Sequence, residues 1–202
     1  MKRINKSTPD FYNDYLRKNS PKEWNTLSQD IGQQIRDYIL DEEQNNQCAY
    51  TEIALGSSTK SSHIDHFKKR ALFPKDTFKW ENLVVSCNSE EYGAKHKDKE
   101  IKLTDYQNLI NPTIENPSDF FHYSFTGKVE EKGQTDAERT KASTTIRLLA
   151  LNNQSLRDRR ATVINHVKNY ALQLSLDEIK SAIGEFDSLV ESIYLAFQKT
   201  EL

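Results

Sequence analysis

Residues 61–70 read SSHIDHFKKR, and they hold two of the chain's five histidines, His63 and His66, with Asp65 between them. The stretch resembles a strand, and successive side chains of a strand point to opposite sides, so His63 and Asp65 are expected on the same side. Histidine titrates close to neutral pH, and a carboxylate oxygen is a hard ligand for a divalent cation. The stretch therefore predicts a strand that is either a polar edge or one half of a catalytic site.

Two further segments extend this pattern along the chain. Asn82 comes sixteen residues after His66, within WENLVVSC, and His96 comes fourteen residues later, within GAKHKDK. The apolar run at 83–85 indicates a second strand, and the lysine-rich segment after it indicates a short helix. Residues 47–102 thus read as strand, loop, strand and helix. Hydrolysis of a phosphodiester needs a metal ion and a base that activates water, and this set of side chains offers candidates for both.

The order HIDHF, WENLVVSC and a histidine before lysines resembles the motif of HNH endonucleases, whose fold is the ββα-metal finger. MKRINKS, CAYTE and TTIRLLALNNQSLRDRR are in addition similar to the HNH subunit of Septu-type anti-phage systems, the PtuB-like family, over roughly residues 1–170. This resemblance implies a metal-dependent endonuclease that acts on DNA or RNA as the effector of a defence complex. It also implies an ABC-like ATPase partner (PtuA-like) and a further use as a retron effector.

The resemblance implies a role for each residue of the first strand and the loop. His66 would be the general base that deprotonates the attacking water, and Asp65 would be a metal ligand. Asn82 would complete the catalytic set by fixing the loop between the strands through side-chain hydrogen bonds.

The second metal ligand is open between two residues. His96 matches the last member of the motif, and Asn88 offers a competing oxygen. His63 would be an additional ligand or would orient one. The expected ion is Mg²⁺, with Mn²⁺ and Ni²⁺ as other divalent candidates.

Charge is distributed unevenly along the 202 residues. The whole chain has a formal net charge of −2, which argues against a protein that coats nucleic acid non-specifically, whereas 60–102 hold ten Lys or Arg and seven Asp or Glu, a net of 10 − 7 = +3. A locally basic surface favours binding of a polyanion. The side chains expected to contact nucleic acid are those of Lys68, Lys69, Lys95, Lys97 and Lys99.

HNH proteins of this kind often hold a structural zinc with two pairs of cysteines, and half of each pair is missing here. Cys48 would pair with position 51, which is Thr51, and Cys87 with the position of Lys95. Because a structural zinc site needs four N or S ligands, we expect no structural zinc and expect Cys48 and Cys87 to be neighbouring free thiols. The loss leaves an alternative open, in which a degenerate, inactive finger only binds nucleic acid or a partner.

The segments on both sides of 47–102 are expected to be mostly helical, so the predicted fold class is α+β, a helical scaffold that carries a small ββα finger. Residues 1–46 would form an N-terminal helical segment, with Ser20 as a helix cap and Pro21 at the first helical position. Residues 103–202 would form a C-terminal helical region with a short hairpin near 120–131. A capping box of Ser175 and Glu178 predicts one long helix over 175–199.

No apolar run approaches the ~20 residues that a membrane-spanning helix needs. The first residues carry charges but lack the apolar segment of a secretory signal. The chain's two cysteines are then expected to stay reduced. These features predict a cytoplasmic protein without a membrane partner.

Overall fold

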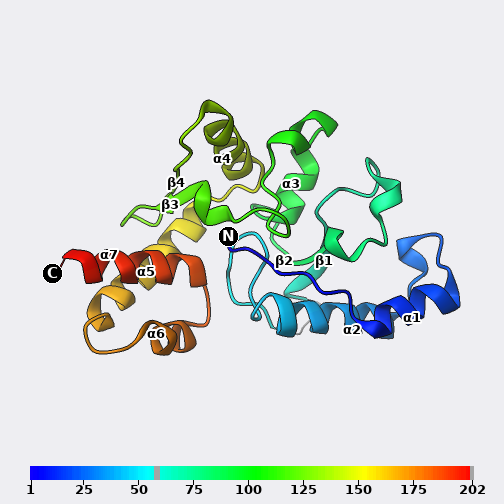
Figure 1. Cartoon of the computed structure of the whole chain (residues 1–202), viewed down its shortest axis with the longest axis horizontal. Helices are drawn as coiled ribbons and strands as arrows, with labels where there is room; N and C mark the ends of the chain where they lie inside the picture. Colours follow the sequence, from blue (N-terminus) through cyan, green and yellow to red (C-terminus); the bar gives the residue numbers. More distant parts are fainter. Residues whose placement is uncertain (57–59, 201–202) are drawn as a thin grey trace.

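The computed structural model describes residues 1–56 and 60–200, and the fold class is α+β, as predicted. Figure 1 shows strands β1 and β2 near the middle of the molecule, with α2 on one side and α3 on the other, and with α5, α6 and α7 at one end. Within the described residues, no helix is both long and apolar enough to cross a membrane.

The central sheet consists of two antiparallel strands. Strand β1 (Ser62–His66) pairs with β2 (Leu83–Cys87), and the register places His63 opposite Ser86 and Asp65 opposite Val84. All five residues of β2 are buried, which explains why its sequence is an apolar run rather than an alternation. Helix α3 (Ala94–Glu100) follows β2, so this part of the chain has the order strand, loop, strand, helix.

Gly93 joins β2 to α3 in a backbone conformation that other residues rarely adopt, with φ +77° and ψ −148°. Its N–H donates to the carbonyl of Leu149 at 2.9 Å, and the N–H of Ala94 donates to the Oγ of Ser86 at 3.3 Å. A Cβ at this position would lie 3.2 Å from Ser86 Oγ. The start of α3 is therefore fixed against the end of β2, which determines the side of the helix that faces β1.

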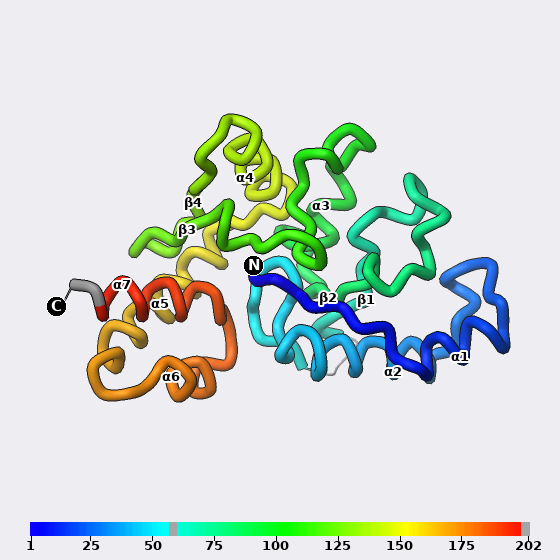
Figure 2. The backbone as a smooth tube through the Cα atoms, in the orientation of Figure 1, coloured from blue at the N-terminus to red at the C-terminus, as the bar shows by residue number. Residues whose placement is uncertain are grey.

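The N-terminal segment contains α1 (Asp10–Asn19) and α2 (Gln29–Tyr38), and the predicted cap at Ser20 is wrong. Ser20 ends α1 in the left-handed conformation, with φ +44°. Ser28 caps α2 instead, because its side chain accepts a hydrogen bond from the N–H of Ile31 at 3.4 Å. Figure 2 shows the residues before α1 running across the molecule beside the sheet, where Lys6 Nζ donates to the carbonyl of Leu83 at 2.8 Å.

The C-terminal half is helical apart from one hairpin, in which β3 (Phe121–Tyr123) and β4 (Val129–Glu131) pair over the residues whose alternation predicts it. Its helices are α4 (Asp136–Leu148), α5 (Gln154–Tyr170), α6 (Leu176–Ile183) and α7 (Asp187–Thr200). The single helix expected over 175–199 is therefore wrong. Gly184 closes α6 in the left-handed region with φ +69°, and α7 begins three residues later.

Aromatic packing joins the loop after β1 to the N-terminal helices. Trp80 is buried, and its ring lies 4.9 Å from that of Tyr12 and 5.7 Å from that of Tyr38. Tyr50 and Phe67 are also buried. The core therefore fixes both ends of the loop between β1 and β2.

Candidate active site

A cavity of about 390 Å³ opens where β1 ends. It combines residues of β1 and of the loop after it with one residue of α3. Its lining consists of His63, Ile64, Asp65, His66, Lys69, Arg70, Ala71 and Asp98. The cavity thus brings histidines, carboxylates and cations together at one point.

The imidazole of His66 is held in one tautomer. Its Nε2 lies 3.0 Å from the carbonyl oxygen of Thr77. A carbonyl can only accept a hydrogen bond, so Nε2 carries the proton and donates, which leaves the lone pair of the neutral ring on Nδ1. The indole of Trp24 packs edge-on against the ring, with the two centroids 4.5 Å apart. This arrangement orients a basic nitrogen.

Burial lowers the pKa of His66 from 6.5 to about 4. The negative charge of Asp65 and the hydrogen bond to Thr77 oppose this shift, while the charges of Arg70 and Lys97 add to it. Imidazole is therefore uncharged at neutral pH, which is the form that can accept a proton.

The lowered pKa predicts a loss of stability in acid. Between pH 6.5 and 4 the unfolded chain protonates at His66 while the folded chain does not, so the free energy of unfolding falls as the pH falls through this window. We expect His66→Gln to reduce the fall between pH 7 and pH 4 by roughly 3 kcal/mol, measured by urea denaturation at each pH. His122→Gln is the matched control, since His122 is exposed and paired with Glu130. An equal pH dependence in all three proteins would contradict the buried, neutral state of His66.

Asp65 is 5% exposed and is held by two groups. The hydroxyl of Tyr50 donates to its Oδ2 at 2.5 Å, and the ammonium of Lys97 lies 3.5 Å from the same oxygen. Lys97 is 0% exposed and also donates to Asp98 Oδ1 at 2.5 Å and to the carbonyl of Phe67 at 3.4 Å. A buried cation therefore lies between the carboxylates of Asp65 and Asp98.

Helix α3 directs Asp98, rather than His96, toward the cavity. Successive residues of an α-helix are rotated by about 100°, so His96 and Asp98 project on opposite sides of Lys97. The Nδ1 of His96 lies 2.9 Å from the carbonyl oxygen of Leu148 at the end of α4. His96 stays a prediction as the second ligand, since a histidine that donates one ring N–H to a carbonyl can bind a metal through its other nitrogen. Asp98 is the residue of α3 that lines the cavity.

Burial, and then the negative charge of Asp65, raise the pKa of Asp98, while the charge of Lys97 opposes the rise. Burial lowers the pKa of Lys97. The carboxylates of Asp65 and Asp98 together raise it by more than burial lowers it, so the pKa lies above its usual value. Lys97 binds both carboxylates, and Lys69 and Arg70 line the same cavity, so its charged groups carry no negative excess. Asp65 and Asp98 supply carboxylate oxygens, the ligand type that hard divalent ions take. Within the described residues, no group of three or more His, Cys, Asp or Glu side chains is placed to hold a metal ion.

The amide of Asn82 holds the two ends of the loop that carries Thr77. Its Oδ1 accepts from the N–H of Lys68 at 2.7 Å, and its Nδ2 donates to the carbonyls of Lys68 at 3.1 Å and Asp76 at 3.0 Å. These are loop-fixing bonds of the kind that the sequence motif implies for Asn82. The loop in turn presents the Thr77 carbonyl to His66.

The side chains of His63 and Asn88, both candidate metal ligands, form a hydrogen bond with each other. The Nδ1 of His63 lies 2.9 Å from Asn88 Oδ1, and Asn88 Nδ2 donates to the carbonyls of Lys60 at 3.1 Å and Ser62 at 3.2 Å. Asn88 ties the start of β1 to the end of β2, and it does not line the cavity. Its role as a ligand stays a prediction. His63 lines the cavity with its ring oriented by Asn88.

The five lysines expected at a nucleic-acid interface separate into three groups. The nucleic-acid contact predicted for Lys97 is wrong, because this side chain is fully buried between two carboxylates and cannot reach a polymer. Lys95 and Lys99 both pair with Glu90, at 2.9 and 2.8 Å. Lys68 lies 3.3 Å from Asp76, and Lys69 lines the cavity.

The predicted neighbouring thiols are confirmed. The N–H of Cys87 donates to the Sγ of Cys48 at 3.4 Å, and both thiols are buried and free. Thr51 is buried on the turn that follows Cys48, and among the described residues its hydroxyl has no hydrogen-bond partner.

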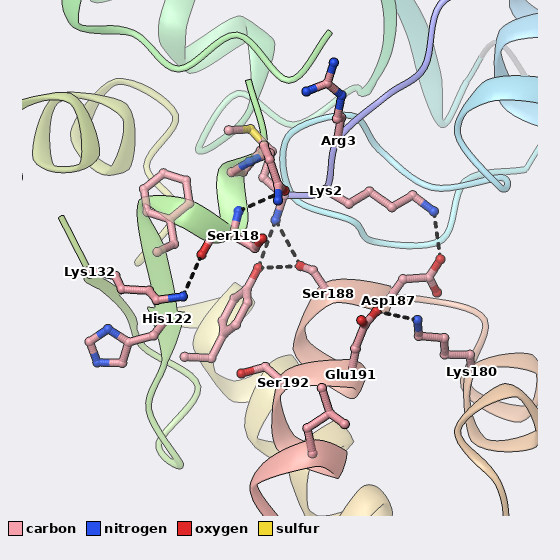
Figure 3. Close-up of a pocket in the computed structure, with 16 residues that line it drawn as sticks. Lys2, Arg3, Ser118, His122, Lys132, Lys180, Asp187, Ser188, Glu191 and Ser192 are labelled. Carbon is pink, nitrogen blue, oxygen red and sulfur yellow. Dashed lines mark hydrogen bonds and ion pairs between the residues drawn. The ribbon is translucent and has the colours of Figure 1, made fainter. Parts of the chain in front are cut away.

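Another cavity, of about 600 Å³, lies between the first residues, the hairpin and α7 (Figure 3). Two of its cations are paired, Lys2 with Asp187 at 2.7 Å and Lys180 with Glu191 at 2.8 Å, and Arg3 and Lys132 also line it. His122 lines it but is exposed and bound to Glu130. We therefore place the candidate active site in the cavity of His66.

Sequence reasoning missed two residues of this cavity, Asp98 and Arg70. Ala94, Lys97 and Ile101 have the spacing of a buried helix face, which is the signal that Lys97 points inward and brings Asp98 to the cavity. Arg70 ends the basic run after His66; it is exposed and donates to Asn25 Oδ1 at 3.3 Å. In comparisons with known proteins, the chain matches no protein-family model, and no curated protein matches it.

Proposed function

We propose that this protein is a metal-dependent endonuclease of the HNH type, which hydrolyses phosphodiester bonds of nucleic acid in the cavity of His66. The observation that carries the proposal is the hydrogen bond from His66 Nε2 to the Thr77 carbonyl. It leaves Nδ1 as a proton acceptor on a residue that lines a cavity together with Asp65, Lys69 and Arg70. The order of β1, loop, β2 and α3 supports the same assignment.

In this reaction Nδ1 of His66 takes a proton from water, and the water oxygen forms a bond to phosphorus while the bond to the leaving oxygen breaks. Lys69 and Arg70 hold the negatively charged phosphate, because cations in a partly dry cavity stabilise charge that increases in the transition state. A divalent ion such as Mg²⁺ or Mn²⁺, held by Asp65 and Asp98, would supply the charge that binds the phosphate and stabilises the leaving oxygen.

The role as effector of an anti-phage complex with an ABC-like ATPase is part of this proposal and rests on the resemblance of the motif and its flanks to the Septu-type HNH subunit. The assay therefore uses the purified chain with and without an ATPase encoded beside its gene. Substrates are labelled single- and double-stranded DNA and RNA, each with Mg²⁺, Mn²⁺, Ni²⁺ or EDTA. Binding without cleavage under all these conditions would replace the proposal with a nucleic-acid-binding module.

The cavity predicts which residue of α3 supports cleavage. We expect Asp98→Asn to lower the cleavage rate on the order of a hundredfold, the upper range for loss of a group that supports a metal site, because a neutral amide replaces a charged oxygen ligand. His96→Ala is the comparison, and its rate should stay within about threefold of the wild type, since His96 binds the Leu148 carbonyl. Single-turnover rates in Mn²⁺ provide the measurement. The opposite result, with His96→Ala inactive and Asp98→Asn active, would identify His96 as the ligand.

A further inference from the structure

Arg36, in the last turn of α2, is a buried cation without a carboxylate partner among the described residues. It is 6% exposed, and its Nη2 donates to the side-chain oxygen of Gln33. Its Nε is buried and has no hydrogen-bond partner in the described part of the chain. Burial of an arginine without a counter-ion is costly, so this side chain points to a negatively charged ligand.

Arg36 lines a cavity of about 670 Å³ that adjoins the candidate active site. His63 and Ile64 line both cavities, so the two are neighbours along β1. Trp24 forms another part of the wall, and its ring also packs against the imidazole of His66. The charged or titratable groups that line this second cavity are Arg36, His63 and Asp30.

We infer that this cavity is a subsite for the nucleic-acid strand next to the cleaved bond, in which Arg36 binds a neighbouring phosphate. The inference rests on the proposed function and adds to it a residue that binds the substrate. A strand whose cleaved phosphate lies beside His66 continues past His63 into the second cavity. The guanidinium fork matches two phosphate oxygens, and the indole of Trp24 offers a surface on which a base stacks.

The chemistry of the cavity favours a phosphodiester over a carboxylate of a protein partner. The cavity shares His63 and Ile64 with the catalytic one, and a polymer substrate must extend beyond the catalytic cavity. An aromatic ring beside a cation is the combination that single-stranded nucleic acid uses, stacking for the base and charge for the backbone. An acidic peptide would use the charge of Arg36 alone.

The test measures binding in EDTA, so that cleavage does not interfere. The probes are fluorescent single strands of DNA and of RNA, each about 12 nucleotides long. They are titrated with the wild type, Arg36→Gln, Arg36→Lys and Arg17→Gln, each at several salt concentrations. We expect Arg36→Gln to weaken binding about tenfold, the loss of one charge-assisted contact, and to reduce the salt slope by about 0.7. Arg36→Lys should weaken binding less, because the charge stays while the fork is lost. Arg17 is exposed and paired with Asp14, so Arg17→Gln should bind as the wild type does.

Equal affinity and salt slope for Arg36→Gln and the wild type, with both folded by circular dichroism, would overturn the inference. If Arg36→Gln does not fold, wild-type affinity in Arg36→Lys would overturn it too, since the fork would be dispensable. Competition by a glutamate-rich peptide as strong as that by the oligonucleotide would assign the site to a protein partner. The protein could bind the strand through Arg36 and yet cleave nothing with any metal. That result would refute the proposed function but support the subsite.

Discussion

Replacing Lys97 with methionine is expected to destabilise the protein by about 3–5 kcal/mol, the cost of removing one partner from a buried ion pair. Lys97 is fully buried, and it lies 3.5 Å from Asp65 Oδ2 and 2.5 Å from Asp98 Oδ1. Without its ammonium, the buried carboxylate of Asp65 would lose its cation, whereas the Asp98 side chain is 36% exposed and stays in contact with solvent. Urea denaturation gives the difference in the free energy of unfolding.

Lys95→Met is the matched control, because Lys95 lies on the same helix and pairs with the exposed Glu90. Its effect should stay below about 1 kcal/mol, as for other surface ion pairs. The Lys97 variant has a second expected property. Mn²⁺ should stabilise Lys97→Met more than the wild type, since an ion held by Asp65 and Asp98 would replace the missing positive charge. A Lys97→Met protein as stable as the wild type would contradict the buried charge arrangement.

Replacing His66 with glutamine is expected to lower the cleavage rate roughly 10²- to 10⁴-fold, the range for loss of a general base. The glutamine amide can still donate to the Thr77 carbonyl, so the loop between β1 and β2 stays in place, but the basic Nδ1 is gone. The measurement is the single-turnover rate on a labelled oligonucleotide at pH 8. His122→Gln should keep the wild-type rate, and a His66→Gln enzyme within threefold of it would assign the base elsewhere.

Local patterns were sufficient to predict the order of elements around the site. The strand-like stretch at residues 61–66, which follows a Gly/Ser-rich turn, and the apolar run at 83–85 predict β1 and β2, because turn residues bound both segments. The contact between Cys48 and Cys87 was also predicted, although the interpretation depended on a family pattern. The two strands depend on residues that are neighbours in sequence, and the contact between the two cysteines depends on how the strands pair.

Helix orientation was not predicted, and it determines which residue completes the cavity. The motif places His96 by its position along the chain alone, but Gly93 fixes the start of α3 and turns Lys97 and Asp98 toward β1. A lysine in a buried helix face conflicts with the usual pattern, and its explanation, the carboxylate of Asp65, lies more than thirty residues away. The break between α6 and α7 was missed for a similar reason, because Gly184 fits a helix sequence but adopts a left-handed conformation.

The central claim is that the cavity of His66 cleaves phosphodiester bonds, and one measurement tests it directly. End-labelled DNA and RNA are incubated with purified wild type in Mn²⁺, with wild type in EDTA and with His66→Gln in Mn²⁺, and the products are separated on one denaturing gel. We expect shortened products with the wild type in Mn²⁺ and intact substrate in the other two. Equal products from His66→Gln, or intact substrates with the wild type in every metal, would contradict it.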